Sequence, residues 1–423
     1  MTIAELHTVF LECNSVCTDT RKLNKNDIFF ALKGDTFNGN TYAEQALNTG
    51  AKYAIIDEPE YNISSNTILV NNVLETLQNL ASYHRNYLNL PIIALTGSNG
   101  KTTTKELINT VLAKKYNTTA TIGNLNNHIG VPLTLLSMTK STEIGIVEMG
   151  ANHLKEIEFL CKIAQPDFGY ITNFGKAHLE GFGGVEGVIK GKSEMYDYLI
   201  KNNKTIFVNG NDAIQLEKTQ NTNPSIFNSK AGDISIKFIS AQPFVSCQYQ
   251  SQKIESHLIG EYNFNNISAA IAIGHYFKVK ATDIKAAIEN YIPSNNRSQI
   301  LNIGTNKVIL DAYNANPTSM QAALQNFENQ GGNKIAILGD MFELGAAAKE
   351  EHQIIHDLCN NLNINKVYLV GENFYKTKIN DDKIKRYKTF SDFQANFNIH
   401  EINNTTLLIK GSRGMALERI LDN

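Results

Sequence analysis

The length, composition and charge of the chain limit the classes of protein to which it can belong. Its 423 residues are too many for one hydrophobic core and predict two to three domains. A hydrophobic content of 42%, a charged content of 19% and a net charge of −2 predict a soluble globular protein with no general attraction to nucleic acid or acidic membranes. The sequence shows no transmembrane run or export signal, and its five cysteines are scattered. We therefore expect a cytoplasmic protein.

The first 85 residues are expected to form a small α/β domain. Residues 27–32 and 51–57 are strand-like, and a helical stretch at residues 43–48 separates them. Residues 86–90 then lead into a new apolar run. We therefore place the first domain boundary between residues 85 and 86.

Residues 86–295 are expected to form a central domain in which strands and helices alternate, which predicts a parallel sheet covered by helices. One helix is expected to open at Asn152, and the polar section 224–258 is expected to add strands at the edge of this sheet. The expected strands are at residues 91–95, 144–149, 168–172 and 205–209. The second expected helix is at residues 185–199.

Residues 296–423 show a second alternating series and are expected to form a Rossmann-like domain. The turn at residues 293–298 is the expected hinge before it. The expected strands are at residues 308–313, 334–338, 366–370 and 406–410, with helices at 319–329 and 347–361.

The most informative motif is TGSNGKTTTKE at residues 96–106, a glycine-rich turn directly after an apolar run. Gly97 and Gly100 permit positive φ angles and let backbone N–H groups face an anion. The helix that follows adds its N-terminal dipole. Lys101 can reach the β- and γ-phosphates of a nucleotide, and the Thr102 hydroxyl can ligate magnesium. The motif therefore predicts a nucleoside triphosphate site.

The alternative interpretation is a glycine-rich turn that only caps a helix. The order of strand, Gly-Lys-Thr and helix disfavours this alternative. Leu95 stands where the usual P-loop has its first glycine, so the motif is the shorter TGxxGKTxT. This shorter loop belongs to a narrower set of enzymes.

Further polar residues follow the expected strands, where ligands bind in open α/β sheets. Glu148 ends one strand and His178 follows another, but an exposed Glu and a structural His are common alternatives. Lys192 opens a helix whose first turn would favour an acid, and an ordinary solvated lysine is the alternative, with Lys190 equally visible. The amides of Asn126 and Asn127 fit turn chemistry or a polar ligand, and either remains open.

Three polar loops are expected to converge on one edge of the last sheet. They are the segment that begins at Asp311, the segment 338–345, and the segment that holds Lys410 and Arg413. The two cations suit an anionic substrate such as a carboxylate.

Taken together, these motifs resemble those of the Mur ligase family, ATP-dependent enzymes that extend the peptide of the bacterial cell-wall precursor. The resemblance covers the whole chain. The TGxxGKTxT loop is common to Mur ligases and folylpolyglutamate synthases. The runs NLNNHIGVPLTLL, AHLEGFGG, DAYNANPTSM and KGSRGM are more particular to the member that joins D-alanyl-D-alanine to UDP-N-acetylmuramoyl-tripeptide. The resemblance therefore implies this amide-forming, ADP-forming reaction through an acyl phosphate in cytoplasmic peptidoglycan synthesis.

The resemblance also implies roles for individual residues. Lys101, His178 and Lys192 would be catalytic, with Lys192 carbamylated. Thr102, Glu148, His178 and Lys192 would hold two magnesium ions. The residues implied to bind ATP are Gly97, Ser98, Asn99, Gly100, Lys101, Thr102, Thr103, Asn266, Arg297 and Asp311. The residues implied to bind the UDP-peptide and the dipeptide are Thr20, Arg21, Lys33, Asn126, Asn127, Asn314, Asn316, Lys410 and Arg413.

The chain departs from the family pattern in two places. Tyr262 and Asn263 stand where the family commonly has His-Asn near the adenine, and Ser193 stands where Gly is more usual. We expect a monomer with small-molecule substrates. Another amide ligase of the superfamily and a nucleotide-binding regulatory protein are the alternatives, and the third residue of the tripeptide is left open.

Overall fold

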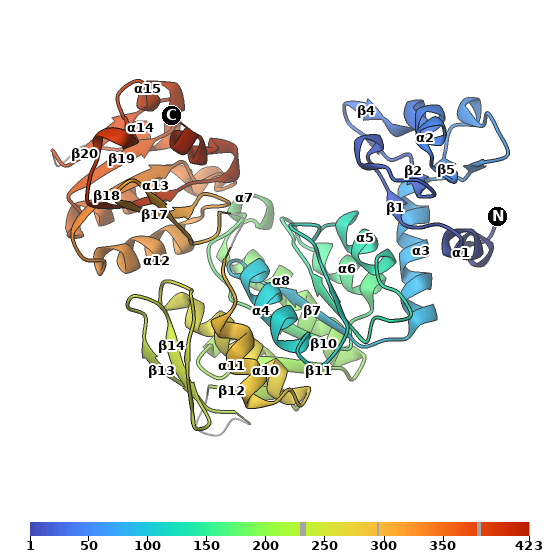
Figure 1. Ribbon diagram of the computed structural model, residues 1–423, viewed down its shortest axis with the longest axis horizontal. Helices are drawn as coiled ribbons and strands as arrows, with labels where there is room; N and C mark the ends of the chain where they lie inside the picture. Colours follow the sequence, from blue (N-terminus) through green and yellow to red (C-terminus); the bar gives the residue numbers. More distant parts are fainter. Residues whose placement is uncertain (229–233, 294–295, 379–381, 423) are drawn as a thin grey trace.

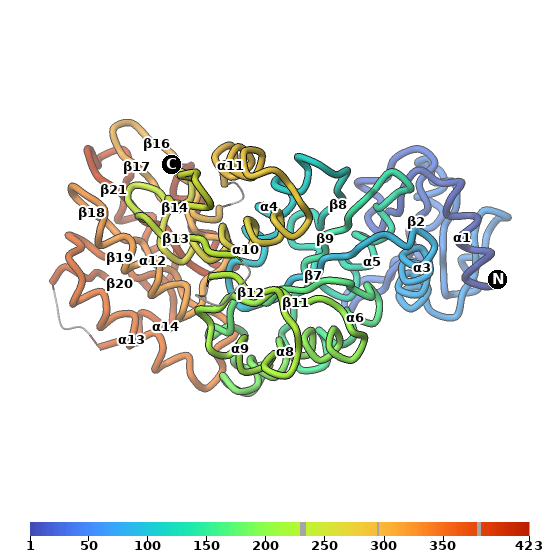
Figure 2. Tube along the Cα trace, turned by 90° about the horizontal axis from the view of Figure 1, so that it is seen from below, coloured from blue at the N-terminus to red at the C-terminus, as the bar shows by residue number. Residues whose placement is uncertain are grey.

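Three α/β domains follow one another along the chain in the computed structural model, which describes residues 1–228, 234–293, 296–378 and 382–422. The N-terminal and C-terminal domains lie at opposite sides of the central domain (Figure 1). Figure 2 shows the same order from below. The expected three-domain α/β architecture is confirmed. The expected hinge at 293–298 lies partly outside the described residues.

The N-terminal domain is a four-stranded parallel sheet with a short hairpin. The strand order is β1-β2-β5-β6, with β1 Val16–Cys17, β2 Ile28–Phe30, β5 Tyr53–Ile56 and β6 Thr67–Leu69. The hairpin consists of β3 Lys33–Gly34 and β4 Phe37–Asn38. The helices are α1 Ile3–Leu11, α2 Ala43–Thr49 and α3 Val73–Leu88.

Helix α3 connects the first two domains. The Asn72 side chain caps its start by accepting from the Glu75 amide, and Asn89 ends it in a left-handed conformation. Leu77 and Leu80 lie on its buried face, and the helix packs against α5 and α6 of the central domain. The expected boundary between residues 85 and 86 therefore falls inside this helix.

The central domain has a six-stranded parallel sheet with the order β12-β11-β10-β7-β9-β8. The strands are β7 Ile92–Thr96, β8 Thr118–Ala120, β9 Ile144–Glu148, β10 Phe168–Ile171, β11 Thr205–Asn209 and β12 Ser225–Phe227. The helices are α4 Lys101–Leu112, α5 Gly130–Leu136, α6 Glu156–Ala164, α7 Leu179–Phe182, α8 Val185–Lys201, α9 Ala213–Thr219, α10 Tyr262–Tyr276 and α11 Ala281–Glu289. Strands β7 and β9 are buried along their whole length, as expected for a parallel sheet that helices cover on both faces.

Two expectations for the central domain are wrong in part. Only β12 of the section 224–258 joins the edge of the main sheet. The strands β13 Ile236–Ser240, β14 Ser246–Tyr249 and β15 Gln252–Glu255 form a separate antiparallel sheet. Helix α6 begins at Glu156 and not at Asn152, because the Asn152 amide donates to the Glu156 carboxylate and Lys155 adopts a left-handed conformation.

The C-terminal domain has a six-stranded sheet with the order β16-β17-β21-β18-β19-β20. Only β16 is antiparallel to its neighbour among these pairings. The strands are β16 Gln299–Ile303, β17 Asn306–Asp311, β18 Asn333–Gly339, β19 Lys366–Val370, β20 Ile384–Tyr387 and β21 Thr405–Lys410. The helices are α12 Pro317–Glu328, α13 Ala348–Asn361, α14 Glu372–Tyr375 and α15 Phe390–Gln394. The expected strands and helices of this domain are confirmed within a few residues.

Candidate active site

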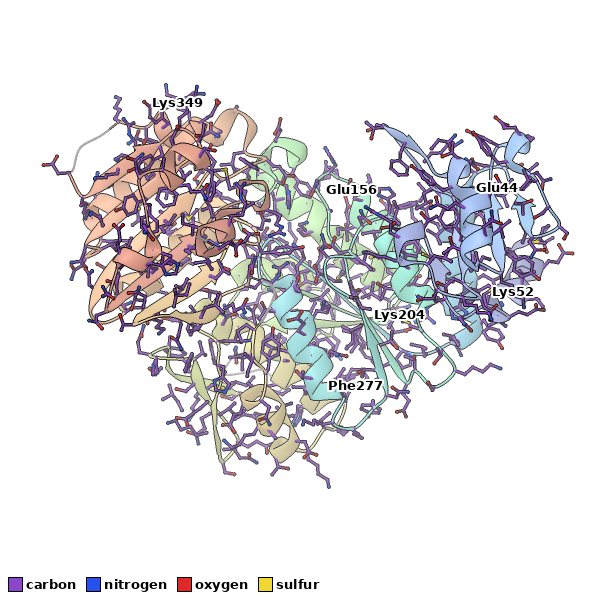
Figure 3. All side chains as sticks on the ribbon, turned by 45° about the horizontal axis from the view of Figure 1, so that its top comes forward. Glu44, Lys52, Glu156, Lys204, Phe277 and Lys349 are labelled. Carbon is purple, nitrogen blue, oxygen red and sulfur yellow. The ribbon has the colours of Figure 1, made fainter. Side chains whose placement is uncertain are left out.

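A cavity of about 570 Å³ lies between the central and C-terminal domains. Its walls come from the P-loop, from the segments after β9 and β10, from the start of α10 and from the polar loops of the C-terminal domain. Figure 3 labels one lining residue, Glu156, near the middle of the molecule between the two outer domains. Since the carboxyl ends of the strands face this cavity, it occupies the usual ligand position of an open α/β sheet.

The P-loop leads directly from β7 into α4, as the sequence predicts. Gly97 has a φ of 143°, and a Cβ atom there would lie 2.0 Å from the Thr172 hydroxyl oxygen. Gly100 has a φ of 78°, and a Cβ atom there would lie 2.6 Å from Oδ1 of Asn266. Both positions therefore require glycine, for backbone conformation and for space.

The end of β10 supports the P-loop from one side. The Thr172 hydroxyl and the Asn173 amide both donate to the Asn99 carbonyl, at 2.6 Å and 2.9 Å. Oδ1 of Asn173 accepts from the Asn99 amide at 3.1 Å. Sequence reasoning missed these two supporting residues, although their position after a predicted strand was a usable signal.

Lys101 lines the cavity. Its Nζ donates to the carbonyls of Gly97 and Ser98 at 2.7 Å and 3.4 Å. Burial lowers the pKa of Lys101, and the charge of Glu148 acts in the opposite direction. The ammonium group is therefore held over the loop in which a phosphate would bind.

Glu148 provides the test of whether the site fits a divalent cation. Its side chain is 1% exposed at the end of β9, and Oε1 accepts from the Asn126 amide at 2.8 Å. Oε2 is buried and has no hydrogen-bond partner among the described residues. A buried carboxylate oxygen with free lone pairs is a ligand that magnesium prefers. Thr102 and His178 line the same cavity, so Glu148, Thr102 and His178 are suitable ligands for a magnesium ion.

The protein groups alone do not form a complete metal cage. Within the described ranges there is no cluster of three His, Cys, Asp or Glu side chains with metal-binding geometry. Magnesium commonly takes one or two carboxylates and completes its shell with water and substrate phosphates. The site is therefore of the kind that holds magnesium together with a nucleotide.

Lys192 lies in the middle of α8 and not at the start of a helix as expected. It is buried, so the solvated-lysine alternative is wrong for it, whereas Lys190 is exposed. Its Nζ donates to the Ala151 carbonyl at 3.0 Å and lies 5.0 Å from the centre of the Phe182 ring. Burial, and then the charge of Lys101, lower the pKa of Lys192 well below the usual value for a lysine. This environment favours a neutral, nucleophilic amine directly behind the cavity wall.

His178 meets the C-terminal domain. It adopts a left-handed conformation just before α7, and its Nδ1 forms a short hydrogen bond with the carboxylate of Glu343. A neutral imidazole that donates from Nδ1 keeps a lone pair on Nε2 for a metal ion. Glu343 was not singled out from the sequence, although its loop was.

The C-terminal domain contributes an ion pair to the cavity. Nζ of Lys410 lies 2.5 Å from Oδ2 of Asp311, and the Ser298 amide donates to Oδ1 of Asp311 at 3.0 Å. The guanidinium of Arg297 stacks on the Tyr313 ring at 3.8 Å. Asp311 neutralises Lys410, whereas Arg297, like Lys101, has no carboxylate in ion-pair contact among the described lining residues.

The asparagines that the sequence singled out mostly hold loops in place. Asn127 accepts from the Gly130 amide, the Asn314 carbonyl accepts from Lys410, and Asn316 caps the start of α12. Asn126, Asn127 and Asn314 line the cavity as well. Asn266 lies behind Gly100 and accepts from the Thr104 hydroxyl at 3.0 Å.

Five predicted substrate residues lie outside the cavity lining, namely Asn316 at the start of α12 and four others. Arg413 is mostly exposed and forms an ion pair with Glu418. Thr20, Arg21 and Lys33 lie in the N-terminal domain, where Arg21 pairs with Asp19 and Lys33 with Asp57. The structure therefore brings together the predicted ATP and metal residues, and keeps the predicted UDP residues on a separate domain.

The fold and the site define a nucleotide-dependent enzyme whose cavity is shared by two domains. Family profiles agree with this class. Residues 12–87 match the Mur ligase family catalytic domain, 95–274 match the Mur ligase middle domain, and 296–413 match the Mur ligase glutamate ligase domain. The chain belongs to the Mur ligase family.

Individual relatives show which members of the family the chain is similar to. The UDP-N-acetylmuramoyl-tripeptide–D-alanyl-D-alanine ligase of Bacillus subtilis is 34% identical, over 96% of this chain and 92% of the relative. The ligase of that name from Escherichia coli is 32% identical, over 99% and 95%. A crystal structure of MurF from Acinetobacter baumannii superposes with a TM-score of 0.87 at 29% identity, covering 100% of this chain and 98% of that one. MurF from Thermotoga maritima in complex with ADP gives 0.84 at 26% identity, covering 98% and 97%.

None of the helices in the described ranges combines the length and apolar character that crossing a membrane requires.

Proposed function

We propose that the protein is the ATP-dependent, ADP-forming ligase that joins D-alanyl-D-alanine to UDP-N-acetylmuramoyl-tripeptide in cytoplasmic peptidoglycan precursor synthesis. The observation that carries the proposal is the cavity between the P-loop and the polar loops of the C-terminal domain, in a chain that resembles such ligases over its whole length. The P-loop provides the binding site for ATP, and the second domain that faces it provides the binding site for an acceptor.

The proposed reaction has two steps. The terminal carboxylate of the tripeptide attacks the γ-phosphorus of ATP, ADP leaves, and an acyl phosphate forms. The amine of D-alanyl-D-alanine then attacks the acyl carbon, inorganic phosphate leaves, and the amide forms after loss of a proton. Lys101 and the P-loop amides stabilise the charge that develops on the phosphoryl oxygens. Closure of the C-terminal domain keeps water from the acyl phosphate.

Magnesium, when bound, would neutralise phosphate charge and orient the γ-phosphoryl group. Thr102, Glu148 and His178 are the proposed ligands together with a carbamate on Lys192, and two ions are expected. The buried amine of Lys192 suits this modification, because a neutral amine can attack carbon dioxide and lose a proton to become a carbamate anion. The modification would also explain why a lysine occupies a buried position next to Lys101.

The carbamate can be tested on the protein directly. We expect a carbamate carbon signal in the NMR spectrum of the protein equilibrated with ¹³C-bicarbonate, and its loss in Lys192→Ala. A short carboxylic acid should partly restore ligation by Lys192→Ala, since it can replace the missing anion. Full activity of the unmodified protein in bicarbonate-free buffer would count against the carbamate.

The remaining predicted residues divide between the substrates. Asn266, Arg297 and Asp311 are proposed to act on the ATP side, and Asn126, Asn127, Asn314, Asn316, Lys410 and Arg413 on the peptide side. Thr20, Arg21 and Lys33 are proposed to hold the UDP end. In a monomeric enzyme, the proposed domain of residues 1–85 would then hold the UDP end, and the proposed domains of residues 86–295 and 296–423 would share the ATP and peptide sites.

A phosphate-release assay with paired substrates tests the function. We expect release from ATP to require both UDP-N-acetylmuramoyl-tripeptide and D-alanyl-D-alanine. Equal stimulation by a single free amino acid would indicate another amide ligase of the superfamily. Parallel assays with tripeptides that end in meso-diaminopimelate or L-lysine would identify the preferred third residue.

A further inference from the structure

The contact between the central and C-terminal domains contains an ion pair that the proposed chemistry does not use. Nζ of Lys176, in the segment between β10 and α7, lies 2.5 Å from Oε1 of Glu351 on α13. The Glu351 side chain is 8% exposed, whereas that of Lys176 is 44% exposed. In the part of the chain that the structure describes, Lys176 is the only ion-pair partner of Glu351. The carboxylate of one domain is therefore paired by a cation that reaches it from the other.

We propose that Lys176 and Glu351 form the latch that holds the C-terminal domain closed over the cavity, and that Lys176 thereby acts as a positioning residue for the P-loop and His178. The cost of a broken pair supports the latch. Without Lys176, Glu351 in the closed arrangement would be a buried carboxylate with no cation, which destabilises that arrangement relative to the open one, in which water can hydrate the carboxylate. Movement of the C-terminal domain away from the central domain separates these two side chains, so the pair favours the closed arrangement.

The backbone of Lys176 is fixed by the same domain. Its amide donates to the Thr318 hydroxyl at 2.9 Å, next to the start of α12. Both ends of Lys176 are therefore held by the C-terminal domain. His178, two residues later, is held by Glu343 of that domain.

This segment is also bonded to the P-loop. The Ser98 hydroxyl donates to the Gly175 carbonyl at 2.7 Å. A Cβ atom on Gly175 would lie 2.9 Å from the Asn99 amide nitrogen and 3.1 Å from the Thr318 hydroxyl oxygen, so the three segments are in close contact. Docking of the C-terminal domain therefore sets the position of the segment that carries His178 and supports Ser98.

Charge reversal tests the latch. The variants are Lys176→Glu, Glu351→Lys and the double variant. Glu351→Gln is included in case Glu351→Lys does not fold, because it removes the charge at nearly constant volume. Closure is measured by energy transfer between fluorophores on the central and C-terminal domains, with and without a non-hydrolysable ATP analogue and magnesium. We expect each single variant to lower the ratio of closed to open molecules about tenfold or more, and the double variant to restore it to within about threefold.

Lys162→Glu is the matched control, because Lys162 pairs with Glu158 within helix α6 and faces solvent. We expect it to leave closure unchanged. Steady-state kinetics give a second readout. The Lys176 and Glu351 variants should lower kcat about tenfold with little change in binding of the UDP-peptide, which contacts neither residue in this proposal.

Unchanged closure in Lys176→Glu and Glu351→Gln would overturn the latch, and so would a double variant that is no better than the single ones. The latch proposal rests on the proposed function only in that it assumes an ATP site in the cavity. Closure with an ATP analogue needs no acceptor, so the latch can be tested even if D-alanyl-D-alanine proves to be the wrong substrate.

Discussion

The two contacts that the central domain makes with its neighbours differ in kind. On the N-terminal side, α3 places an apolar face against α5 and α6. Arg85 of this helix is buried, donates to the carbonyls of Ala164 and Gln165, and pairs with Asp167 at 2.7 Å. The N-terminal contact therefore combines apolar burial with a buried charge network.

The C-terminal contact includes a set of separate polar contacts between side chains. Nδ2 of Asn316 donates to Oδ1 of Asn99 at 2.6 Å, and Lys176 and His178 pair with Glu351 and Glu343. Water can replace most of a polar contact at small net cost, whereas an apolar face cannot be exposed cheaply. We infer that the N-terminal contact is permanent and that the C-terminal contact opens and closes during turnover.

The largest expected effect is on the rate of the reaction and involves neither domain contact. We expect Lys101→Ala to lower the rate of phosphate release about 10³-fold or more, because the substitution removes the cation that faces the transferred phosphoryl group. The free energy of unfolding should change little, since Lys101 belongs to neither contact. Phosphate-release kinetics and urea unfolding measure the two quantities. A loss of less than tenfold would contradict the assignment of the P-loop lysine.

The next effect tests the permanence of the N-terminal contact. We expect Arg85→Ala to lower the free energy of unfolding by about 3 kcal/mol, because two carbonyls and Asp167 lose a buried partner. Lys204→Ala is the control. Lys204, labelled in Figure 3, also pairs with Asp167 but is partly exposed, so its loss should cost less than about 1 kcal/mol. Equal effects in urea unfolding would remove the distinction between the two contacts.

Acid should weaken the N-terminal contact through two buried histidines. Nε2 of His7 bonds Nδ1 of His84 at 2.9 Å, and Nε2 of His84 bonds the Met138 carbonyl at 2.9 Å. Burial, and then the neighbouring His84, lower the pKa of His7 to about 4, and burial lowers that of His84. The folded state therefore prefers neutral imidazoles. This stability is fully present above the unfolded pKa of about 6.5 and is lost as the pH falls towards the folded value.

We expect the wild type to lose about 2 kcal/mol more stability than the variant His7→Gln/His84→Gln between pH 7 and pH 5. Urea unfolding at the two pH values measures the difference. The wild type and the variant would show the same pH dependence if the histidine pair did not contribute.

The smallest effect concerns the C-terminal contact. Ser at position 316 would still cap α12 but could not donate to Asn99 as the amide does. We expect Asn316→Ser to lower kcat about fivefold while the free energy of unfolding changes by less than about 0.5 kcal/mol. In Asn99→Ala/Asn316→Ser the loss should not exceed that of the worse single variant, because both remove one contact. Additive losses would show that Asn316 acts independently of Asn99.

Local patterns in the sequence predicted the parts of the structure that depend on local geometry. The P-loop is such a part, because Gly97 and Gly100 meet their backbone requirements within a few residues of the strand and helix. The sheet β13-β14-β15 was placed wrongly, because alternation predicts strands but not the sheet that they join. The start of α6 was misplaced because Asn152 resembles a cap, while the Glu156 carboxylate satisfies the preceding amides.

Pairings between distant residues could not be predicted from the sequence. Asp311 and Lys410 are almost 100 positions apart, so nothing local indicated that the lysine is neutralised. Lys192 has the spacing of an ordinary helical lysine, and only the structure shows that it is buried. The residue pattern left Lys190 and Lys192 equally visible, and the resemblance to a known family gave Lys192 its predicted role.

The position of α3 across the first boundary has a consequence for how such chains can recombine. A chimera joined just after Leu88 would place the α3 of one parent against the α5 and α6 of another, and every side chain of that interface would have to match. A junction just before β16 keeps the C-terminal sheet whole. It divides the chain between domains that meet through single hydrogen bonds, such as those of Asn316 with Asn99 and of Lys176 with Thr318. Exchange of whole C-terminal domains between relatives should therefore be tolerated far more often than exchange of N-terminal ones.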